Sequence, residues 1–362
     1  MTETSKPQAK VGRMGFESNE YLSWYLPRVR GESAKPAINL HASGMPALSA
    51  DELAPTAGEP WSMAGRFEAA LGEWLGIPAE EVVFTSGATG GTLLALLCLA
   101  RPGSAVLIES SMYEPMRRQA ERLNHVRRLP RSIDDAWRVD PASADLGGEV
   151  AMVLITEPQN PSGIASPREA VLELAARCAD AGAVLLINEV YRGFTDAPSY
   201  HGTAESTVVV SSLSKLCGAY AARLGWLSAR PEICVQLRQG LWNASVTPGP
   251  TAAAGVTVMQ RIDELAARAR ETSRAGVGVV DDWVGATPGL EWHRPDVGFG
   301  CVRLPQGIGD LALAERLHDE HGVLVVPGTL WEAPGTLRIS WLQAGEQLRS
   351  GLERIGTVLA GR

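Results

Sequence analysis

Cysteine is scarce in this chain of 362 residues, and the few cysteines follow no pattern. There are five: Cys98, Cys178, Cys217, Cys234 and Cys301. Because the number is odd and no pair has the Cys-x-x-Cys spacing, the sequence excludes a zinc knuckle and a framework of disulfide bonds, and we assign no metal site. Scattered thiols are typical of a reducing compartment, so we expect a cytoplasmic protein.

Long apolar runs are also missing. No stretch of about 18 consecutive apolar residues occurs, and because a membrane-spanning helix needs that length, we expect no contact with a membrane. Residues 1–13 are polar and have no apolar centre like that of a signal peptide. We predict that residues 1–15 form a flexible tail.

Positive charge is in the minority. The chain has 33 Lys and Arg against 41 Asp and Glu, a net charge of −8 at pH 7, which argues against broad nucleic-acid binding. Glu114 and Glu121 interrupt the densest basic cluster, so a solvated helix face or a subunit contact explains that cluster better than a polyanion site. Its members are Arg117, Arg118, Arg122, Arg127, Arg128 and Arg131.

What the chain does contain is an alternation of short apolar runs and helical patterns. Such runs are typical of strands in a parallel sheet that is covered on both faces, and they alternate with amphipathic segments. We therefore predict a large, doubly wound, mainly parallel α/β sheet. The predicted strands are residues 82–84, 105–108, 151–155, 184–187 and 208–210.

The clearest helix is predicted after Ser166. Ser166 can cap it, Pro167 suits its first turn, and Glu169 completes a capping box. One apolar stripe follows at the spacing i, i+3, i+4, i+7, and Gly182 can end the helix in a left-handed conformation. The stripe consists of Val171, Leu174, Ala175 and Cys178.

From about residue 275 the pattern changes to that of a smaller α+β lobe. Residues 312–318 predict a helix, residues 323–326 and 336–340 predict strands, and a last helix follows Gly345. The chain exceeds the length of one ordinary domain. We expect the tail 1–15, a segment 16–45 that joins the small lobe, a large domain 46–270 and a small C-terminal lobe 271–362.

The most informative stretch is residues 212–226, which contains Lys215. A lysine amine forms a Schiff base with an aldehyde, while Ser212 and Arg223 can hold a phosphate nearby. The cofactor that carries both groups is pyridoxal 5′-phosphate. The alternative is a surface lysine in a polar loop. The stretch resembles the lysine signature of fold-type I pyridoxal-phosphate enzymes, the aspartate-aminotransferase-like superfamily, and four further matches follow in the expected order.

The resemblance implies roles for residues that follow the predicted strands. The glycine-rich turn 85–92 precedes a helix, and Ala88 and Thr89 match the contacts to the cofactor phosphate. Tyr113 matches the ring that stacks on the pyridine. Asn160 and Tyr191 match the groups that contact the phenolic oxygen. Read without the resemblance, these residues are a helix cap, a packed surface tyrosine and turn residues.

Asn188 departs from the family pattern. The family has an aspartate here, which keeps the pyridine nitrogen protonated, and a neutral amide supplies no such charge. A protonated ring is the electron sink for the carbanion at the substrate Cα. Three interpretations stay open: the enzyme tolerates a weak sink, its chemistry favours one, or the site no longer catalyses.

Both ends of the chain extend the resemblance. Arg338 matches the arginine that clamps the substrate α-carboxylate. Gly44 matches a glycine near the same carboxylate, and His41 lies close by, with a structural role or an acid–base role open to it. Residues 20–48 resemble a branch that contains capreomycidine synthase. Trp61 lies near the position of a tyrosine that reaches the neighbouring subunit, but its ring lacks the hydroxyl.

The resemblance therefore implies a homodimeric, pyridoxal-phosphate-dependent aminotransferase of amino-acid metabolism. An amino acid would be oriented by Arg338, and Lys215 would remove its Cα proton. Two alternatives remain: elimination, replacement or cyclisation in secondary metabolism, and a non-catalytic protein that binds the cofactor. The side chain of the substrate is not assigned.

Overall fold

Two lobes lie side by side in the computed structural model, joined by the long helix α9, Ile262–Ala286. The structure describes residues 19–30, 36–55, 58, 60–244 and 249–361. The predicted tail 1–15 lies outside these residues, as does the side chain of Trp61. Within the described part of the chain, no helix combines the length and the apolar character that crossing a membrane requires.

The large lobe is built on a seven-stranded sheet with the strand order β2-β8-β7-β6-β5-β3-β4. Five strands form a parallel run, whereas β8 runs antiparallel to both of its neighbours. The prediction of a mainly parallel sheet is confirmed. The strand predicted at 82–84, β2, points the same way as the five parallel strands but is separated from them by the antiparallel β8, which the prediction did not include. The strands are β2 (Val82–Ser86), β3 (Ala105–Glu109), β4 (His125–Leu129), β5 (Val150–Thr156), β6 (Val184–Asn188), β7 (Thr207–Ser212) and β8 (Leu224–Ser228).

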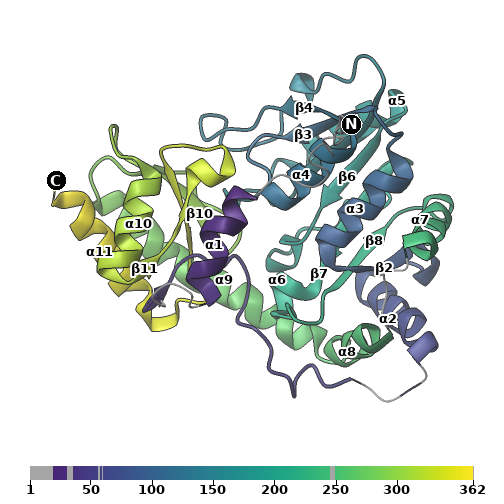
Figure 1. Cartoon of the computed structure of the whole chain (residues 1–362), viewed down its shortest axis with the longest axis horizontal. Helices are drawn as coiled ribbons and strands as arrows, with labels where there is room; N and C mark the ends of the chain where they lie inside the picture. The colour runs from purple at the N-terminus through teal and green to yellow at the C-terminus, as the bar shows by residue number, and fades with distance from the viewer. Residues whose placement is uncertain (1–18, 31–35, 56–57, 59, 245–248, 362) are drawn as a thin grey trace, which may run out of the picture.

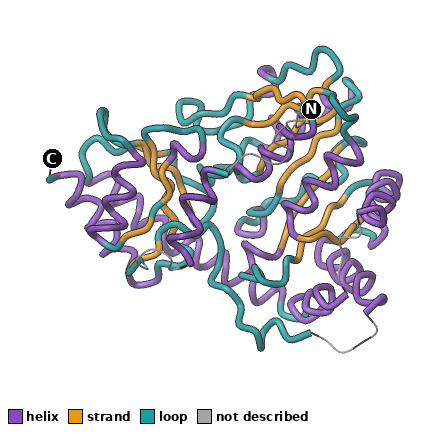
Figure 2. The backbone as a smooth tube through the Cα atoms, in the orientation of Figure 1, coloured by secondary structure: helices purple, strands orange, loops and turns teal. Residues whose placement is uncertain are grey.

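Helices cover both faces of this sheet, as Figure 2 shows. One face packs against α3, α4 and α7, and the other packs against α2, α5 and α8. This arrangement explains why the central strands read as nearly continuous apolar runs. The helices are α2 (Pro60–Leu75), α3 (Gly87–Leu99), α4 (Glu114–Leu123), α5 (Arg168–Asp180), α6 (Leu213–Cys217), α7 (Pro231–Ala244) and α8 (Gly249–Met259).

Helix α5 corrects one detail of the predicted capping. Its apolar stripe is buried and Gly182 has a φ of +67°, both as expected. The cap, however, is Pro167, which offers no side-chain hydrogen bond, and Ser166 does not cap the helix. The Ser166 hydroxyl instead donates to Glu157 Oε1 over 2.7 Å. A hydrogen bond to a buried carboxylate is stronger than one to a backbone N–H at the helix N-terminus, and Pro167 already fixes the backbone there.

Glu157 also pairs with Arg131, so the prediction that the basic cluster lies on a solvated helix face or at a subunit contact is wrong for this arginine. Arg131 is not on a solvated face: its side chain is fully buried and pairs with Glu109 and Glu157 over 2.7 and 2.8 Å. Burial raises the pKa of Glu109 to about 7, against the opposing effect of Arg131. Arg131 therefore joins the carboxyl end of β3, at Glu109, to the residue that follows β5, Glu157.

The small lobe contains a four-stranded antiparallel sheet, β12-β13-β10-β9, and a parallel pair, β1 with β11. The predicted strand at 323–326 is therefore two strands, because β11 pairs with β1 while β12 pairs with β13. The elements are β1 (Ile38–Asn39), β9 (Glu291–Trp292), β10 (Phe299–Arg303), α10 (Asp310–His321), β11 (Val323–Leu324), β12 (Val326–Pro327), β13 (Thr336–Ser340) and α11 (Leu348–Ala360).

The predicted division at 270/271 falls inside α9. The first half of this helix, with Leu265 and Ala269, packs in the core of the large lobe. The second half, with Val280 and Val284, packs in the core of the small lobe. One continuous helix thus belongs to both hydrophobic cores, and the domain division remains a prediction.

Candidate active site

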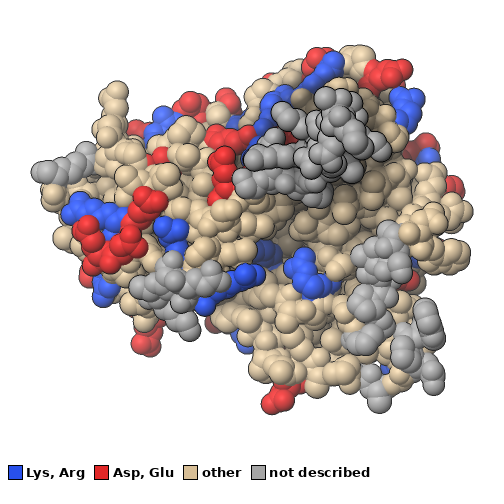
Figure 3. Space-filling model, in the orientation of Figure 1, with Lys and Arg blue, Asp and Glu red and all other residues tan. Residues whose placement is uncertain are grey.

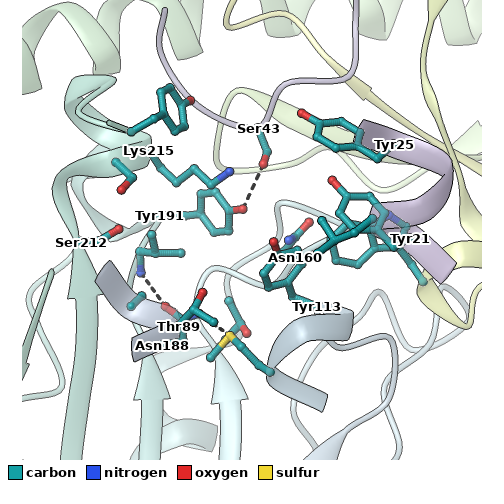
Figure 4. A pocket seen from close by; sticks show the side chains of 18 of the residues that line it. Tyr21, Tyr25, Ser43, Thr89, Tyr113, Asn160, Asn188, Tyr191, Ser212 and Lys215 are labelled. Carbon is teal, nitrogen blue, oxygen red and sulfur yellow. Dashed lines mark hydrogen bonds between the residues drawn. The ribbon is translucent and has the colours of Figure 1, made fainter. Parts of the chain in front are cut away.

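A cavity of about 370 Å³ lies between the carboxyl edge of the large sheet and the small lobe. Its volume is in the range of small-molecule sites. The structure brings together most of the residues that the sequence singled out, and Figure 4 shows several of them around one space. Those that line the cavity are Ala88, Thr89, Tyr113, Asn160, Asn188, Tyr191, Ser212, Lys215, Arg223 and Arg338.

Lys215 lies in α6, the five-residue helix that directly follows β7. Gly218 ends this helix with a φ of +74°, so the lysine is held within a single short turn. Burial, and then the charges of Arg338 and Arg223, lower the pKa of its amine to about 7. No carboxylate of the described residues pairs with this amine. It is also the only lysine beyond residue 35.

Gly44 does not line the cavity but allows the chain to pass Lys215 closely. A Cβ atom at Gly44 would lie 2.4 Å from the Tyr220 hydroxyl and 2.9 Å from the Lys215 Cα. The next residue, Met45, donates its backbone N–H to the Lys215 carbonyl over 2.9 Å. A side chain at Gly44 would therefore collide with the backbone of Lys215 and with Tyr220.

Hydrogen-bond donors without partners gather at one end of the cavity. Helix α3 begins at Gly87, so Ala88 and Thr89 lie in its first turn, where backbone N–H groups are free. Ser214 contributes a buried hydroxyl without a hydrogen-bond partner among the described groups. Unpaired donors at a helix N-terminus are a site for an anion.

Arg223 supplies the charge at this end. It has a φ of +51°, a conformation that is rare for a residue with a side chain and is found preferentially at functional sites. Its guanidinium reaches the start of α3, where a Cβ at Gly87 would lie 2.6 Å from Arg223 Nη2. In the described ranges no acidic side chain pairs with it. This end of the cavity, with Ser212 beside it, suits a phosphate.

Arg338 lies at the other end, in the middle of β13, and is only 2% exposed. It donates to Asn160 Oδ1 and to the His41 carbonyl, each over 2.8 Å, and its guanidinium carbon lies 4.8 Å from the centre of the Trp331 ring. Its Nε has no hydrogen-bond partner in the described part of the structure. A buried guanidinium with neutral partners is prepared to accept a carboxylate.

His41 holds Arg338 through its backbone, while its ring faces an adjoining cavity. Burial, and then the charges of Arg338 and Lys215, lower the pKa of His41 to about 3. The imidazole is therefore neutral at ordinary pH. That state favours a packing role, and the edge-on contact with Tyr25 at 5.0 Å supports it.

The tyrosines close the sides of the cavity. The Tyr191 hydroxyl lies 3.1 Å from Ser43 Oγ, and burial raises its pKa. Tyr113 stacks on Trp331 with ring centres 5.8 Å apart. Asn188 lies at the carboxyl end of β6, 4% exposed, on the side of the cavity away from Lys215 (Figure 4).

Sequence reasoning missed the roof of the cavity, helix α1, Glu20–Arg30. Tyr21 stacks on Tyr25 at 5.1 Å and contacts Trp331 at 5.0 Å. The signal was present, because apolar residues at 21, 22, 25 and 26 share one side of a helix. Four α1 side chains line the cavity: Tyr21, Leu22, Tyr25 and Leu26.

The charge of the cavity has one sign. Lys215, Arg223 and Arg338 line it, and among its described lining residues there is no aspartate or glutamate. Figure 3 shows blue basic atoms in the hollow between the two lobes. Such a cavity attracts a ligand with more than one negative group. Pyridoxal phosphate together with an amino-acid carboxylate fits this requirement, and Lys215 lies between the two cationic ends.

Three comparisons with known proteins agree with this fit. A family model described as aminotransferase class I and II matches residues 14–355. An arginine–pyruvate transaminase from Pseudomonas aeruginosa is 28% identical over 299 residues, which cover 78% of this chain and 76% of the relative.

Two solved structures confirm the predicted fold. A pyridoxal-phosphate-dependent aminotransferase from Streptococcus suis superposes with a TM-score of 0.84 and 22% identity, covering 96% of this chain and 98% of the other. The pyridoxal-phosphate-dependent cyclase OrfR has a TM-score of 0.81 and 20% identity, covering 98% of this chain and all of the other, 100%. At these identities the likeness shows the fold and not the reaction.

Proposed function

The chain belongs to the class I and II aminotransferases and is a pyridoxal-phosphate-dependent transferase, and we propose that it transfers the amino group of an amino acid through Lys215. The observation that carries this proposal is the position of Lys215 between two cationic ends of one cavity that has no described carboxylate in its lining. One end suits the phosphate of the cofactor, and the other suits the carboxylate of the substrate.

Different residues of the cavity would contact different parts of the cofactor. Ser212, Arg223 and the first turn of α3 with Ala88 and Thr89 would hold the phosphate. Asn160 and Tyr191 would lie beside the phenolic oxygen, and Tyr113 would cover one face of the ring. When bound, the cofactor supplies an aldehyde that accepts amines and a ring that withdraws electrons from the substrate Cα.

Two side chains of this protein act on the substrate itself. Arg338 would orient the amino acid by its carboxylate, which fixes the direction of its Cα–H bond. The Lys215 amine would then take the proton from Cα. A lysine with an ordinary pKa is charged near neutral pH and cannot act as a base, whereas a pKa of about 7 leaves much of it neutral.

We further propose that the protein is a homodimer. The support is the family resemblance, in which the site lies at the subunit interface. Light scattering of the purified holoenzyme tests this point: a mass of twice the chain supports it, and a mass equal to one chain contradicts it.

A second candidate reaction is elimination, replacement or ring closure at the substrate side chain. Asn188 favours it, because a neutral group in place of a carboxylate weakens the electron sink. Product analysis separates the two reactions. Transfer yields a keto acid and the aminated cofactor, whereas the alternatives release or rearrange a side-chain group without forming a keto acid.

The experiment that tests the proposed function is reduction of the holoenzyme with borohydride, followed by peptide mass analysis. We expect the visible absorption band of the cofactor to disappear and the peptide that contains Lys215 to gain the mass of the reduced cofactor. In Lys215→Ala the corresponding peptide should gain no mass, because borohydride then reduces only the free aldehyde of the cofactor. Absence of bound cofactor in the wild-type protein, or its attachment elsewhere, would contradict the proposal.

A further inference from the structure

Opposite Lys215, the cavity ends at the neutral side chain of Asn188. This side chain bears on the protonation of the cofactor, and the inference rests on the proposed function. In pyridoxal phosphate the aldehyde lies between the hydroxyl and the phosphate arm, and the ring nitrogen is directly opposite the aldehyde. With the aldehyde at Lys215 and the phosphate at Arg223, the nitrogen points away from the lysine. Asn188 and Met116 line that side of the cavity.

A backbone group fixes the orientation of the Asn188 amide. The Val190 N–H donates to Asn188 Oδ1 over 3.2 Å. Because a backbone N–H can only donate, the oxygen of the amide must face Val190 and the nitrogen must face the other way. Asn188 Nδ2 then lies 3.4 Å from Met116 Sδ. A thioether is a weak acceptor, so a stronger acceptor at this place would attract the remaining N–H of the amide.

No described carboxylate lines the cavity, and the two that are next to Asn188 in the chain or beside its partner strand are already paired. Glu189 is next in sequence, but its carboxylate accepts from Ser199 and the Tyr200 N–H and pairs with Arg192. Glu157 follows Thr156, the partner of Asn188 in the sheet, and is paired with Arg131.

The other titratable groups that line the cavity also oppose a positive ring. Lys215, Arg223 and Arg338 are cationic or become so on protonation, and cations lower the proton affinity of a nearby base. Burial raises the pKa values of Tyr113 and Tyr191, so both hydroxyls stay neutral. The described side chains that line this side of the cavity, Met116, Thr156 and Asn188, are all neutral, and the amide of Asn188 is a donor.

We infer that Asn188 donates an amide N–H to the ring nitrogen of the cofactor and thereby keeps that nitrogen unprotonated. A protonated nitrogen would carry its own N–H and would face two further donors on Nδ2. Rotating the amide to present its oxygen would deprive the Val190 N–H of its acceptor in a buried place. Either arrangement disfavours protonation by about 10- to 100-fold.

In this role Asn188 changes the electronic state of the cofactor and does not merely fill the space beside its ring. A ring that accepts a hydrogen bond withdraws electrons less strongly than a protonated ring, so removal of the Cα proton depends more on Lys215 and on the orientation that Arg338 provides. The carbanion formed at Cα is then stabilised less, which limits the rate of amino transfer.

The test is nuclear magnetic resonance of the wild-type holoenzyme, reconstituted with cofactor that is isotopically labelled at the ring nitrogen. We expect the resonance of an unprotonated pyridine from mildly acidic to mildly alkaline pH. Asn188→Asp should move the resonance to the position of a protonated ring and speed the first half of amino transfer by about 10- to 100-fold. A protonated resonance in the wild-type holoenzyme would overturn the inference even if the variant fails to fold.

Two controls sharpen this test. Asn243→Asp adds the same charge at an exposed position of α7, away from the cavity, and should leave the resonance unchanged. Met116→Leu removes the sulfur beside Asn188 and should also leave the ring nitrogen unprotonated. Protonation of the nitrogen in this variant would show that Met116, and not Asn188, keeps it unprotonated, and would overturn the inference. If the wild-type protein binds no cofactor, the proposed function fails; if it binds cofactor and transfers amino groups with a protonated nitrogen, only this inference fails.

Discussion

The floor and the roof of the cavity are built in different ways. The floor consists of side chains at the carboxyl ends of β5, β6 and β7, where Thr156 and Asn188 are direct partners in the sheet. The roof is helix α1, which touches the site through stacked rings and is anchored to the large lobe by Glu114 of α4. The floor is held by the continuous hydrogen-bonded register of β5, β6 and β7, and the roof by a few contacts that can be broken singly. The expected consequences of mutation follow that contrast.

The largest effect is expected at the floor. Lys215→Ala should abolish covalent attachment of the cofactor and reduce amino transfer by at least about 100- to 10,000-fold, because it removes the base for the Cα proton. Steady-state kinetics with keto-acid detection measure this loss. Recovery of part of the activity by an added small amine would show that the site is otherwise intact, and near-normal activity of the variant would contradict the assignment.

Arg338 lies between floor and roof, and its replacement should have the next largest effect. Arg338→Lys keeps the charge but cannot hold Asn160, the His41 carbonyl and a substrate carboxylate together. We expect kcat/KM for the amino acid to fall by about 10- to 100-fold, with cofactor binding retained. Arg303→Lys on the neighbouring strand β10 is the matched control, since that arginine is much more exposed. Equal losses in both variants would argue against a role for Arg338 in binding the carboxylate.

Arg223 tests the phosphate end of the floor. Since no described acidic group pairs with its guanidinium, Arg223→Gln should weaken cofactor binding by about 10-fold or more while leaving the melting temperature of the cofactor-free protein nearly unchanged. Spectroscopic titration with pyridoxal phosphate gives the dissociation constant. Arg230→Gln, at an exposed arginine just after β8, should leave that constant unaltered. A drop in stability without a change in affinity would make Arg223 a structural residue.

These floor residues are also the ones that the sequence could predict. Asn160 lies shortly after β5, and Asn188 and Ser212 are the last residues of β6 and β7, so a local pattern of apolar run and turn places these three at one edge of the sheet. Tyr21 is different, because its N–H bonds a carboxylate 93 positions away and its ring meets Trp331. No local pattern reports such a contact, and the amphipathic spacing of α1 shows only that it has an apolar face. The Ser166 cap was wrong for the same reason, since its partner is a buried carboxylate brought near by the fold.

The pH dependence of cofactor uptake is a more moderate test of the floor. The neutral lysine attacks the aldehyde, and the pKa of Lys215 is lowered to about 7 by burial and by the two arginines. The rate of reconstitution of the cofactor-free protein should therefore rise with pH up to about 7 and level off above it, being roughly 10-fold lower one pH unit below the pKa. Stopped-flow absorbance follows this rate. A rate that keeps rising toward the ordinary pKa of lysine would contradict the lowered value.

The smallest effect is expected at the roof, where Glu114 accepts the N–H groups of Glu20 and Tyr21 over 3.2 and 2.7 Å. A negative group at a helix N-terminus contributes about 0.3–1 kcal/mol, or a factor of roughly 2 to 5. Glu114→Gln keeps an oxygen acceptor but loses the charge, so α1 should lie over the cavity less often and KM for the amino acid should rise by about 2- to 5-fold, with kcat little changed. Glu121→Gln is the control on the same helix, because that carboxylate pairs with Arg117 and makes no bond to α1 among the described residues. A loss in Glu114→Gln as large as that in Arg338→Lys would break the contrast and make the roof as rigid a part of the site as the floor.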